Sequence, residues 1–335
     1  MKVLKHLILF FGLTLLTNSV TADSLTFRIG TGGSEGTYYP IGTLLSRAIT
    51  GANIQQPSEN NKNIVAVAQR SNGSVANVSD IEEGLLEGAL SQADIAHWAY
   101  HATGPFSNDQ PKTSLRTVAS LYSESFHLIA RADSNIHSIH DLKGRNVSID
   151  EIGSGTLYDV ELILSAFGIQ LDDINPVYLK LKDSINRLRN NEVDALILVA
   201  GAPVQQIVDL VNEGIASVIS LEGQDINGLD QKHPFLSLDA MPAGTYGNDA
   251  DILSFSVPAQ LLVSASLDDD LVYEISKALW SEQSKNLLYS GHPKGRDISI
   301  ANAIAGVSIP LHPGAKRFYE EQSIDTSNIP EGSVN

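Results

Sequence analysis

The stretch GTGGSEGT, at residues 30–37, contains residue types and spacings that could carry chemistry. Its G-x-S-x-G run, from Gly32 to Gly36, matches the nucleophile elbow of serine hydrolases, in which Ser34 would attack a carbonyl carbon. That reaction needs a histidine base and an oxyanion hole, and no histidine of the chain stands in a recognisable hydrolase context. Catalysis by Ser34 is therefore the weaker interpretation of this stretch.

The same stretch also begins like a nucleotide-binding loop. A dinucleotide fingerprint needs glycine at position 35, where this chain has Glu35, and the Lys-Ser/Thr pair of a P-loop is missing. A carboxylate inside a phosphate cradle would repel the phosphate, so both interpretations fail. Two remain: a glycine-rich turn that needs flexible backbone, or a cradle whose N–H groups and hydroxyls bind a carboxylate at a helix N-terminus.

Two further loops share this composition, at residues 71–74 (SNGS) and 153–156 (GSGT). Each of the three loops follows an expected strand and precedes an expected helix, which places them at the edge of an α/β sheet where ligands bind. A tight turn needs no hydroxyl groups, so their repeated presence favours a ligand site. Ser154 and Thr156 also suit the N-cap position of a helix, and the two roles are compatible.

The elements that position these loops follow from the hydrophobic pattern. Strands are expected at residues 25–31, 63–69, 114–122, 125–133 and 193–201, and helices at 38–50, 75–90, 157–168, from Pro203 and at 268–280. Residues 93–103 are expected to form a short strand that runs into a helix. This alternation predicts an α/β fold with parallel sheets.

The first residues indicate export. Lys2 and Lys5 precede an apolar run at residues 7–16, and Val20-Thr21-Ala22 suits a signal peptidase, so we expect a signal peptide at 1–22 cleaved after Ala22. The apolar run is shorter than the roughly 20 residues that span a bilayer. The expected location is the periplasm. A net charge of −17 argues against binding of nucleic acid or anionic membranes through bulk charge.

His97 and His101 lie four residues apart on an expected helix, a spacing that can chelate a metal ion. The chain has no cysteine, and Trp98 stands where the H-E-x-x-H motif has its glutamate. Two ordinary histidines are the favoured interpretation. We expect no metal, no cofactor and no enzymatic activity.

The chain resembles the TAXI family in a series of segments. In order along the chain they are IGTGGSEGTYYPIG, RSNGSVANV, LRTVASLYSESFHLIARADSNIHSIHDLKGRNVSI, GSGT, VDALILVAGAP and NAIAGVSIPLHPGAKRFY. TAXI proteins are the extracytoplasmic solute receptors of one class of TRAP transporters. The resemblance covers nearly all of the chain after the leader. Each segment alone is a weak signal, and the ordered set is specific.

The resemblance implies the type II periplasmic-binding-protein fold: two α/β lobes, a hinge and a ligand cleft between them. Lobe one is expected at 24–123 and 264–335, and lobe two at 124–263. The implied partners are TRAP membrane subunits, fused or separate, driven by an ion gradient. The implied solute is a small carboxylate or dicarboxylate, or an acidic amino acid, glutamate-like or 2-oxoglutarate-like. We expect a monomer.

The loops and the resemblance together indicate which residues line the cleft. Gln92 stands where the family pattern has a pocket glutamine, and Gly201 would let the backbone approach the ligand closely. The expected ligand-binding residues are Gly33, Ser34, Thr37, Tyr38, Ser71, Asn72, Gly73, Ser74, Gln92, Ser154, Gly155, Thr156 and Gly201.

The chain departs from the family pattern in two of these loops. The family commonly has glycine where this chain has Glu35, and Ser71-Asn72 stand where it usually has threonine-glycine. Glu35 either faces solvent or meets a ligand ammonium, which would favour an amino acid over a simple dicarboxylate. Two other functions stay open: a receptor of the same fold that serves an ABC importer or a sensor kinase, and an exported serine hydrolase that uses Ser34.

Overall fold

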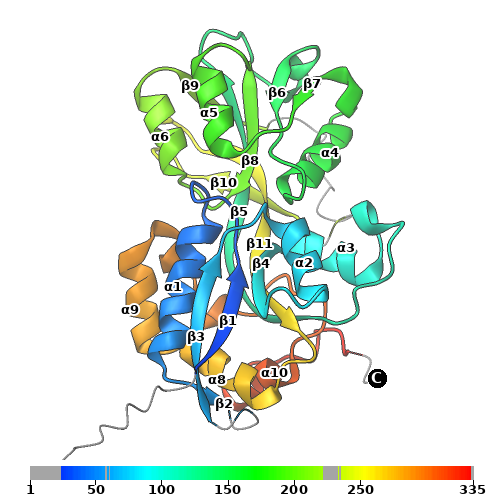
Figure 1. Ribbon diagram of the computed structural model, residues 1–335. Coiled ribbons are helices and arrows are strands. Elements are labelled where there is room, and N and C mark those ends of the chain that lie inside the picture. The colour runs from blue at the N-terminus through cyan, green and yellow to red at the C-terminus, as the bar shows by residue number, and fades with distance from the viewer. Residues whose placement is uncertain (1–23, 57–58, 60, 222–232, 234, 333–335) are drawn as a thin grey trace, which may run out of the picture.

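The computed structural model describes residues 24–56, 59, 61–221, 233 and 235–332. The expected signal peptide and its cleavage after Ala22 lie outside these residues. Within them, the chain forms two α/β lobes joined by the long strands β5 and β11, which pair with each other (Figure 1). In the part of the chain that is described, no helix combines the length and the apolar character needed to cross a membrane.

One sheet runs through both lobes. Lobe one is built on β2 (Gln55–Gln56), β3 (Lys62–Gln69), β1 (Ser24–Gly30) and β4 (Gly88–Gln92), in that spatial order. The sheet continues through β11 (Ile252–Ser264) and β5 (Leu115–Arg131) into lobe two, which is built on β8 (Ala195–Ala200), β6 (Asn146–Ser148) and β7 (Asn175–Val177). Two strands lie off this path: β10 (Ser237–Met241) pairs with β11, and β9 (Ala216–Ile219) pairs with β5.

Strand direction differs between the lobes and their connection. β1 is parallel to β3 and β4, and β6 is parallel to β7 and β8. The crossing strands are antiparallel to each other and to the neighbours β4 and β8. The expected parallel pairing is therefore confirmed for β1 with β3 and β4 and for β6 with β7 and β8, whereas the crossing strands and β2, which is antiparallel to β3, make the sheet mixed.

The helices pack on both faces of this sheet (Figure 1). They are α1 (Tyr38–Gly51), α2 (Ser74–Glu82), α3 (Ala93–His101), α4 (Thr156–Ala166), α5 (Leu181–Arg189), α6 (Gln205–Asn212), α8 (Asp269–Leu279), α9 (Glu282–Gly291) and α10 (Pro313–Glu321). Short 3-10 helices are η2 (Gly104–Phe106), η3 (Ile139–Leu142), η4 (Leu171–Asp173), η6 (Pro293–Arg296) and η7 (Ile300–Asn302).

Alternating apolar residues on the strands build a separate core on each face. In lobe one, Leu261 and Val263 pack into the cluster under α1, α8 and α10, while Leu262 packs into the cluster under α2 and α3. In lobe two, Leu128 and Ile129 divide in the same way between the α4 side and the α5 and α6 side. This division follows because successive side chains of a strand point to opposite faces of a sheet.

The packing also marks where the chain passes from one lobe to the other. On β5, Tyr122 packs in a lobe-one cluster and Phe126 in a lobe-two cluster. On β11, Val257 packs in lobe two and Ala259 in lobe one. The lobe limits expected from the sequence, 24–123 with 264–335 and 124–263, stay a prediction.

Three expected elements differ in the structure. The helix expected at 75–90 ends at Glu82, and its last residues belong to β4, which is buried along its whole length. Residues 93–101 are helical from Ala93, and the strand that runs into this helix is β4, which ends at Gln92 instead of beginning at residue 93. The two strands expected at 114–122 and 125–133 are the single strand β5.

Candidate ligand site between the lobes

The three glycine- and hydroxyl-rich loops come together where the two lobes meet. The first two are tied by Asn77, a fully buried residue whose Nδ2 donates to the carbonyl of Thr31 and to that of Leu90, each at 2.7 Å. The Ser71 hydroxyl donates to the same Thr31 carbonyl at 2.8 Å. These bonds fix two strand-to-helix turns of lobe one against each other, at the sheet edge that faces lobe two.

Lobe two contacts these loops directly through the turn before α4. The Ala76 amide donates to the Gly153 carbonyl at 3.1 Å, and the Asn72 side chain donates to the Ile152 carbonyl at 3.2 Å. On the other side of the site, the Thr37 hydroxyl donates to the Gly201 carbonyl at 3.4 Å. The lobes therefore touch on both sides of the site, and the conformation is closed.

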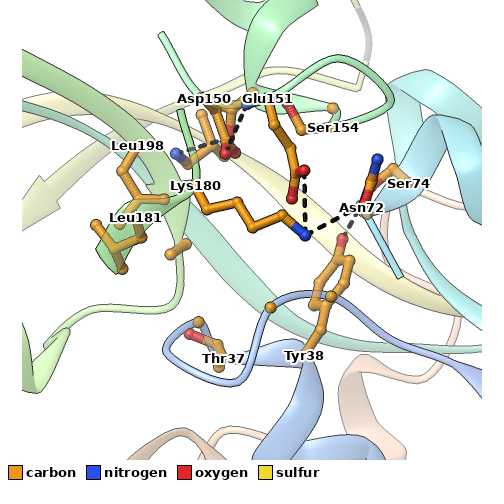
Figure 2. A pocket seen from close by; sticks show the side chains of 18 of the residues that line it. Thr37, Tyr38, Asn72, Ser74, Asp150, Glu151, Ser154, Lys180, Leu181 and Leu198 are labelled. Atoms are coloured by element: carbon orange, nitrogen blue, oxygen red, sulfur yellow. Dashed lines mark hydrogen bonds and ion pairs between the residues drawn. The ribbon is translucent and has the colours of Figure 1, made fainter. Parts of the chain in front are cut away.

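A cavity of about 90 Å³ lies between the lobes at this point. Figure 2 shows Thr37 and Tyr38 on one side of it and Leu181 and Leu198 on another. Its wall is formed by Gly32, Gly33, Glu35, Gly36, Thr37, Tyr38, Asn72, Gly73, Ser74, Gln92 and Glu124 from lobe one and the first crossing strand, and by Asp150, Glu151, Ser154, Gly155, Thr156, Lys180, Leu181, Leu198, Val199 and Ala200 from lobe two.

Three helices begin at this wall. The N-cap residues of α1, α2 and α4 are Thr37, Gly73 and Gly155, and all three line the cavity. None of them uses its own side chain to cap its helix. The amides of a first helical turn have no partner within the helix, and the helix dipole adds partial positive charge there. The wall therefore offers three positions that suit a negatively charged group.

Glu124 is a buried carboxyl in the same wall. Only 2% of its surface is exposed, and its Oε2 accepts a hydrogen bond from the Tyr38 hydroxyl at 2.7 Å. The Tyr38 hydroxyl also lies 3.3 Å from the Ser74 hydroxyl, as Figure 2 shows. Burial raises the pKa of Glu124 to about 8, although the bond from Tyr38 acts in the opposite direction. At neutral pH without a cationic partner, this carboxyl is mostly protonated.

Lys180 is the basic side chain in the wall, and it extends across the cavity (Figure 2). Its Nζ lies 3.3 Å from Glu151 Oε2 and 3.5 Å from Asn72 Oδ1. Asp150, next to Glu151, is also in the wall, and burial raises its pKa to about 6. Lys180 therefore bridges the lobes and already has one acidic partner.

A second buried acidic group lies behind the wall. Gln92 Nε2 donates to Asp159 Oδ2 at 2.7 Å, which links β4 of lobe one to α4 of lobe two. Asp159 and Asp94 are both buried and interact with each other; burial raises the pKa of both, and the negative charge of Asp94 raises that of Asp159 further. One oxygen of each carboxyl has no hydrogen-bond partner. A proton shared between these two oxygens would satisfy both.

Ten of the residues expected to bind the ligand are in the wall. They are Gly33, Thr37, Tyr38, Asn72, Gly73, Ser74, Gln92, Ser154, Gly155 and Thr156. Ser154 and Thr156 were also considered as N-caps. The Ser154 hydroxyl accepts a hydrogen bond from the Leu157 amide, in the first turn of α4, at 3.4 Å. The Thr156 hydroxyl instead accepts from the Val199 amide, on β8, at 3.2 Å.

Three expected residues lie off the cavity wall. The Ser34 hydroxyl is exposed and donates to Glu35 Oε1 at 3.0 Å, and Ser71 holds the loops together as described above. Both line an open groove beside the cavity. Gly201 packs closely instead, because a Cβ at this position would lie 2.7 Å from Lys294 Cγ.

Four charged residues of the wall were neither expected nor considered from the sequence: Glu124, Asp150, Glu151 and Lys180. Glu124 had a signal in the sequence, because the polar run Ser123-Glu124-Ser125 interrupts an otherwise apolar segment. Asp150 and Glu151 directly precede the GSGT loop. Lys180 follows a strand that is only three residues long and gave no signal.

The histidines considered as metal ligands from their spacing lie on α3. The His97 and His101 rings lie 4.5 Å apart between centroids. Among the described residues, no group of three or more histidine, cysteine, aspartate or glutamate residues is arranged to hold a metal ion.

The fold is the mixed α/β, type II periplasmic-binding-protein fold. XAC2383 from Xanthomonas citri, in a structure bound to ATP, shares 13% identity, covers 89% of this chain and 95% of its own, and has a TM-score of 0.50. Periplasmic binding protein BugD shares 11% identity over 89% of this chain and 94% of its own, with a TM-score of 0.50. The alkanesulfonate-binding protein SsuA from Xanthomonas axonopodis pv. citri, bound to MOPS, reaches a TM-score of 0.49 at 14% identity, over 89% and 84% of the two chains.

Two lobes, two crossing strands and a cavity between them are the architecture of the type II periplasmic-binding-protein fold. The chain belongs to the NMT1-like family, whose profile matches residues 29–323.

Proposed function

We propose that this protein is a periplasmic receptor that captures a small carboxylate or an acidic amino acid between its lobes and delivers it to TRAP-type membrane subunits. The observation that carries the proposal is the cavity whose wall holds the N-termini of α1, α2 and α4, from both lobes. Amides at helix N-termini suit a carboxylate. A cavity of about 90 Å³ suits a small solute.

The proposed mechanism is rotation of the lobes about β5 and β11, with lobe one at 24–123 and 264–335 and lobe two at 124–263. The bonds from Asn72 to Ile152 and from Ala76 to Gly153 form only when the lobes meet. A solute held by groups of both lobes stabilises this closed form, because it binds the closed form more tightly than the open one. The solute is released unchanged.

The ordered resemblance of the sequence to TAXI receptors supports the TRAP partner. That partner supplies energy from an ion gradient, whereas an ABC importer would use ATP. Uptake by membrane vesicles that contain the cognate subunits separates the two: TRAP-coupled uptake stops when the ion gradient is dissipated, and ABC-coupled uptake stops when ATP is withheld.

Isothermal titration calorimetry tests the proposal that the solute is a carboxylate. The protein is freed of co-purified ligand by unfolding and refolding, and is then titrated with L-glutamate, L-glutamine, 2-oxoglutarate, succinate, malate and a neutral amino acid. We expect saturable one-to-one binding of at least one acidic member. A refolded protein that binds none of them contradicts the proposal.

The wall of the cavity contains no histidine among the described residues, and the Ser34 hydroxyl is bonded to Glu35 outside it. This arrangement does not favour the serine hydrolase considered from the sequence. The variant Ser34→Ala separates the two functions: we expect it to retain solute binding, and no ester or amide hydrolysis should be measurable in the unaltered protein.

A further inference from the structure

Acidic groups outnumber basic groups in the wall of the cavity by four to one. Its acidic residues are Glu35, Glu124, Asp150 and Glu151, and its basic residue is Lys180. Because Lys180 already lies 3.3 Å from Glu151, little cationic charge is left for a solute that brings only carboxylates. A solute that also carries a cation would correct this balance.

Glu124 is the acid best placed to meet such a cation. Its exposed fraction is only 2%, it lines the cavity, and its hydrogen-bond donor in the protein is the Tyr38 hydroxyl. A carboxylate has about four acceptor sites on its two oxygens, so one donor leaves most of its capacity unused. An ammonium supplies three donors and a positive charge.

We propose that Glu124 binds an ammonium group of the solute, which makes the solute an amino acid rather than an unaminated mono- or dicarboxylate. This inference rests on the proposed function, since it assumes that the solute occupies the interlobe cavity. The carboxylate of the amino acid then lies toward the helix N-termini, and its ammonium toward Glu124. The residue on the first crossing strand thereby selects the class of solute.

Glu35 was the acid considered for this role from the sequence. It lines the cavity as well, but it is partly exposed, and it accepts a hydrogen bond from the exposed Ser34 hydroxyl. An ion pair that water reaches contributes little to affinity, whereas an enclosed charge-assisted bond contributes much more. The geometry therefore favours Glu124 over Glu35.

Binding of the ammonium includes a balanced proton transfer. The protonated carboxyl of Glu124 loses its proton to the solvent, and the resulting carboxylate accepts hydrogen bonds from the ammonium, which keeps all its own protons. The charged and titratable groups around Glu124 are Tyr38 on α1, Asp94 on α3, Asp159 on α4, Tyr122 on its own strand and Lys294 on η6. Of these, Asp94 opposes ionisation of Glu124, whereas Tyr38 and Lys294 favour it.

The test compares L-glutamate with glutarate, which is the same molecule without the amino group. Each is titrated at pH 7 in buffers of different ionisation enthalpy, so that the number of protons released is measured with the affinity. Because other groups respond to closure in the same way for both ligands, the difference between them isolates the ammonium. We expect L-glutamate to release about one proton more than glutarate, since a carboxyl with a pKa near 8 is mostly protonated at pH 7.

Three variants complete the test. In Glu124→Gln we expect the affinity for L-glutamate to fall about 100-fold or more, the affinity for glutarate to change less than tenfold, and the extra proton release to disappear. Glu35→Gln examines the rival acid in the same wall. Glu192→Gln, an exposed glutamate away from the cavity, controls for the loss of one charge. Thermal unfolding of the ligand-free proteins shows that each variant is folded.

The outcomes separate the inference from the proposed function. If glutarate binds as tightly as L-glutamate and releases as many protons, the ammonium inference is overturned while the carboxylate receptor stands. If Glu35→Gln and not Glu124→Gln removes the preference for L-glutamate, the assignment to Glu124 is overturned. If neither ligand binds, and 2-oxoglutarate and L-glutamine do not bind either, the proposed function falls and the inference falls with it. Should Glu124→Gln fail to fold, the proton difference in the unaltered protein still decides.

Discussion

At the scale of single residues, the Tyr38 hydroxyl controls how Glu124 is held. The variant Tyr38→Phe removes the 2.7 Å bond to Glu124 and the 3.3 Å contact with Ser74 and keeps the ring. Hydrogen bonds to charged groups contribute about 1.5–3 kcal/mol, so we expect L-glutamate to bind about 10- to 100-fold more weakly. The pKa of Glu124 rises at the same time, because the bond from Tyr38 lowers it. Calorimetric titration measures both effects.

Tyr39→Phe is the matched control for this variant. Tyr39 is the next residue, it does not line the cavity, and its ring centroid lies 5.9 Å from the guanidinium carbon of Arg70. Its hydroxyl should therefore not affect binding. Equal losses of affinity in the two variants would contradict the role given to Tyr38.

The glycine and hydroxyl residues of the site could be predicted from the sequence, because a loop between a strand and a helix identifies itself by composition. Which charged side chains would reach the cavity could not be predicted. Glu124 lies on a strand, and only the fold shows that its side of the strand faces the cavity rather than a core. Lys180 comes from a turn of lobe two, and its distance from Asn72 depends on how the lobes meet.

At the scale of elements, the contact between the start of α4 and lobe one depends on Gly155, because this residue has no side chain. A Cβ at Gly155 would lie 1.4 Å from Gln92 Oε1 on the other lobe, although the backbone at Gly155, with φ −76°, suits any residue. We therefore expect Gly155→Ala to fold normally and to prevent full closure. Small-angle X-ray scattering with saturating ligand should show a larger radius of gyration than for the unaltered protein, and ligand affinity should fall by a factor of 100 or more.

Gly36→Ala is the comparison for this variant, because a Cβ there would meet nothing closer than 3.7 Å. It alters the same wall without a contact between the lobes, so its scattering should keep the compact form. If the Gly155→Ala variant closes as completely as the unaltered protein, the role given to Gly155 is refuted. Its unfolding temperature without ligand shows whether lobe two is intact.

Most strands and helices near the site could be predicted from hydrophobic periodicity, and the exceptions have a common cause. The segment GLLEGALSQ carries leucines at a helical spacing, yet its second half is β4. This strand pairs with β1 on one edge and β11 on the other, and both of its faces are buried. A strand covered on both sides has no polar face, so its pattern does not alternate. β5 does not alternate simply either: the polar run Ser123-Glu124-Ser125 lies at its centre, Glu124 alone of the three lines the cavity, and the run made one strand look like two.

At the scale of the whole molecule, closure brings together two carboxyls that are on different lobes. Asp94 and Asp159 are buried against each other, and burial raises the pKa of both. The closed form therefore takes up a proton at any pH between the ordinary value, about 4, and the raised one. The stability that this proton adds to the closed form is fully present at low pH and is lost as the pH rises through this range. We therefore expect the affinity for glutarate to fall by up to tenfold per pH unit in this range.

Asp159→Asn tests this proton uptake. Its amide can donate to Asp94 without a proton from the solvent, so the pH dependence of glutarate binding should become weaker while closure is retained. Asp172→Asn, which changes an exposed aspartate of the same lobe, should keep the pH dependence of the unaltered protein. A variant at position 159 that titrates like the unaltered protein would show that the proton is taken up elsewhere.

The first crossing strand, β5, continues unbroken from one lobe to the other, and Glu124 lies where it leaves the first core and enters the second. Atoms near a rotation axis move least, so under the proposed rotation about β5 and β11 Glu124 would already be in position while the lobes are apart. Discrimination between solutes would then take place at the first encounter, before closure. A molecule without an amine would leave the open protein quickly, and its short dwell time rather than a slow closing step would keep it from the membrane subunits.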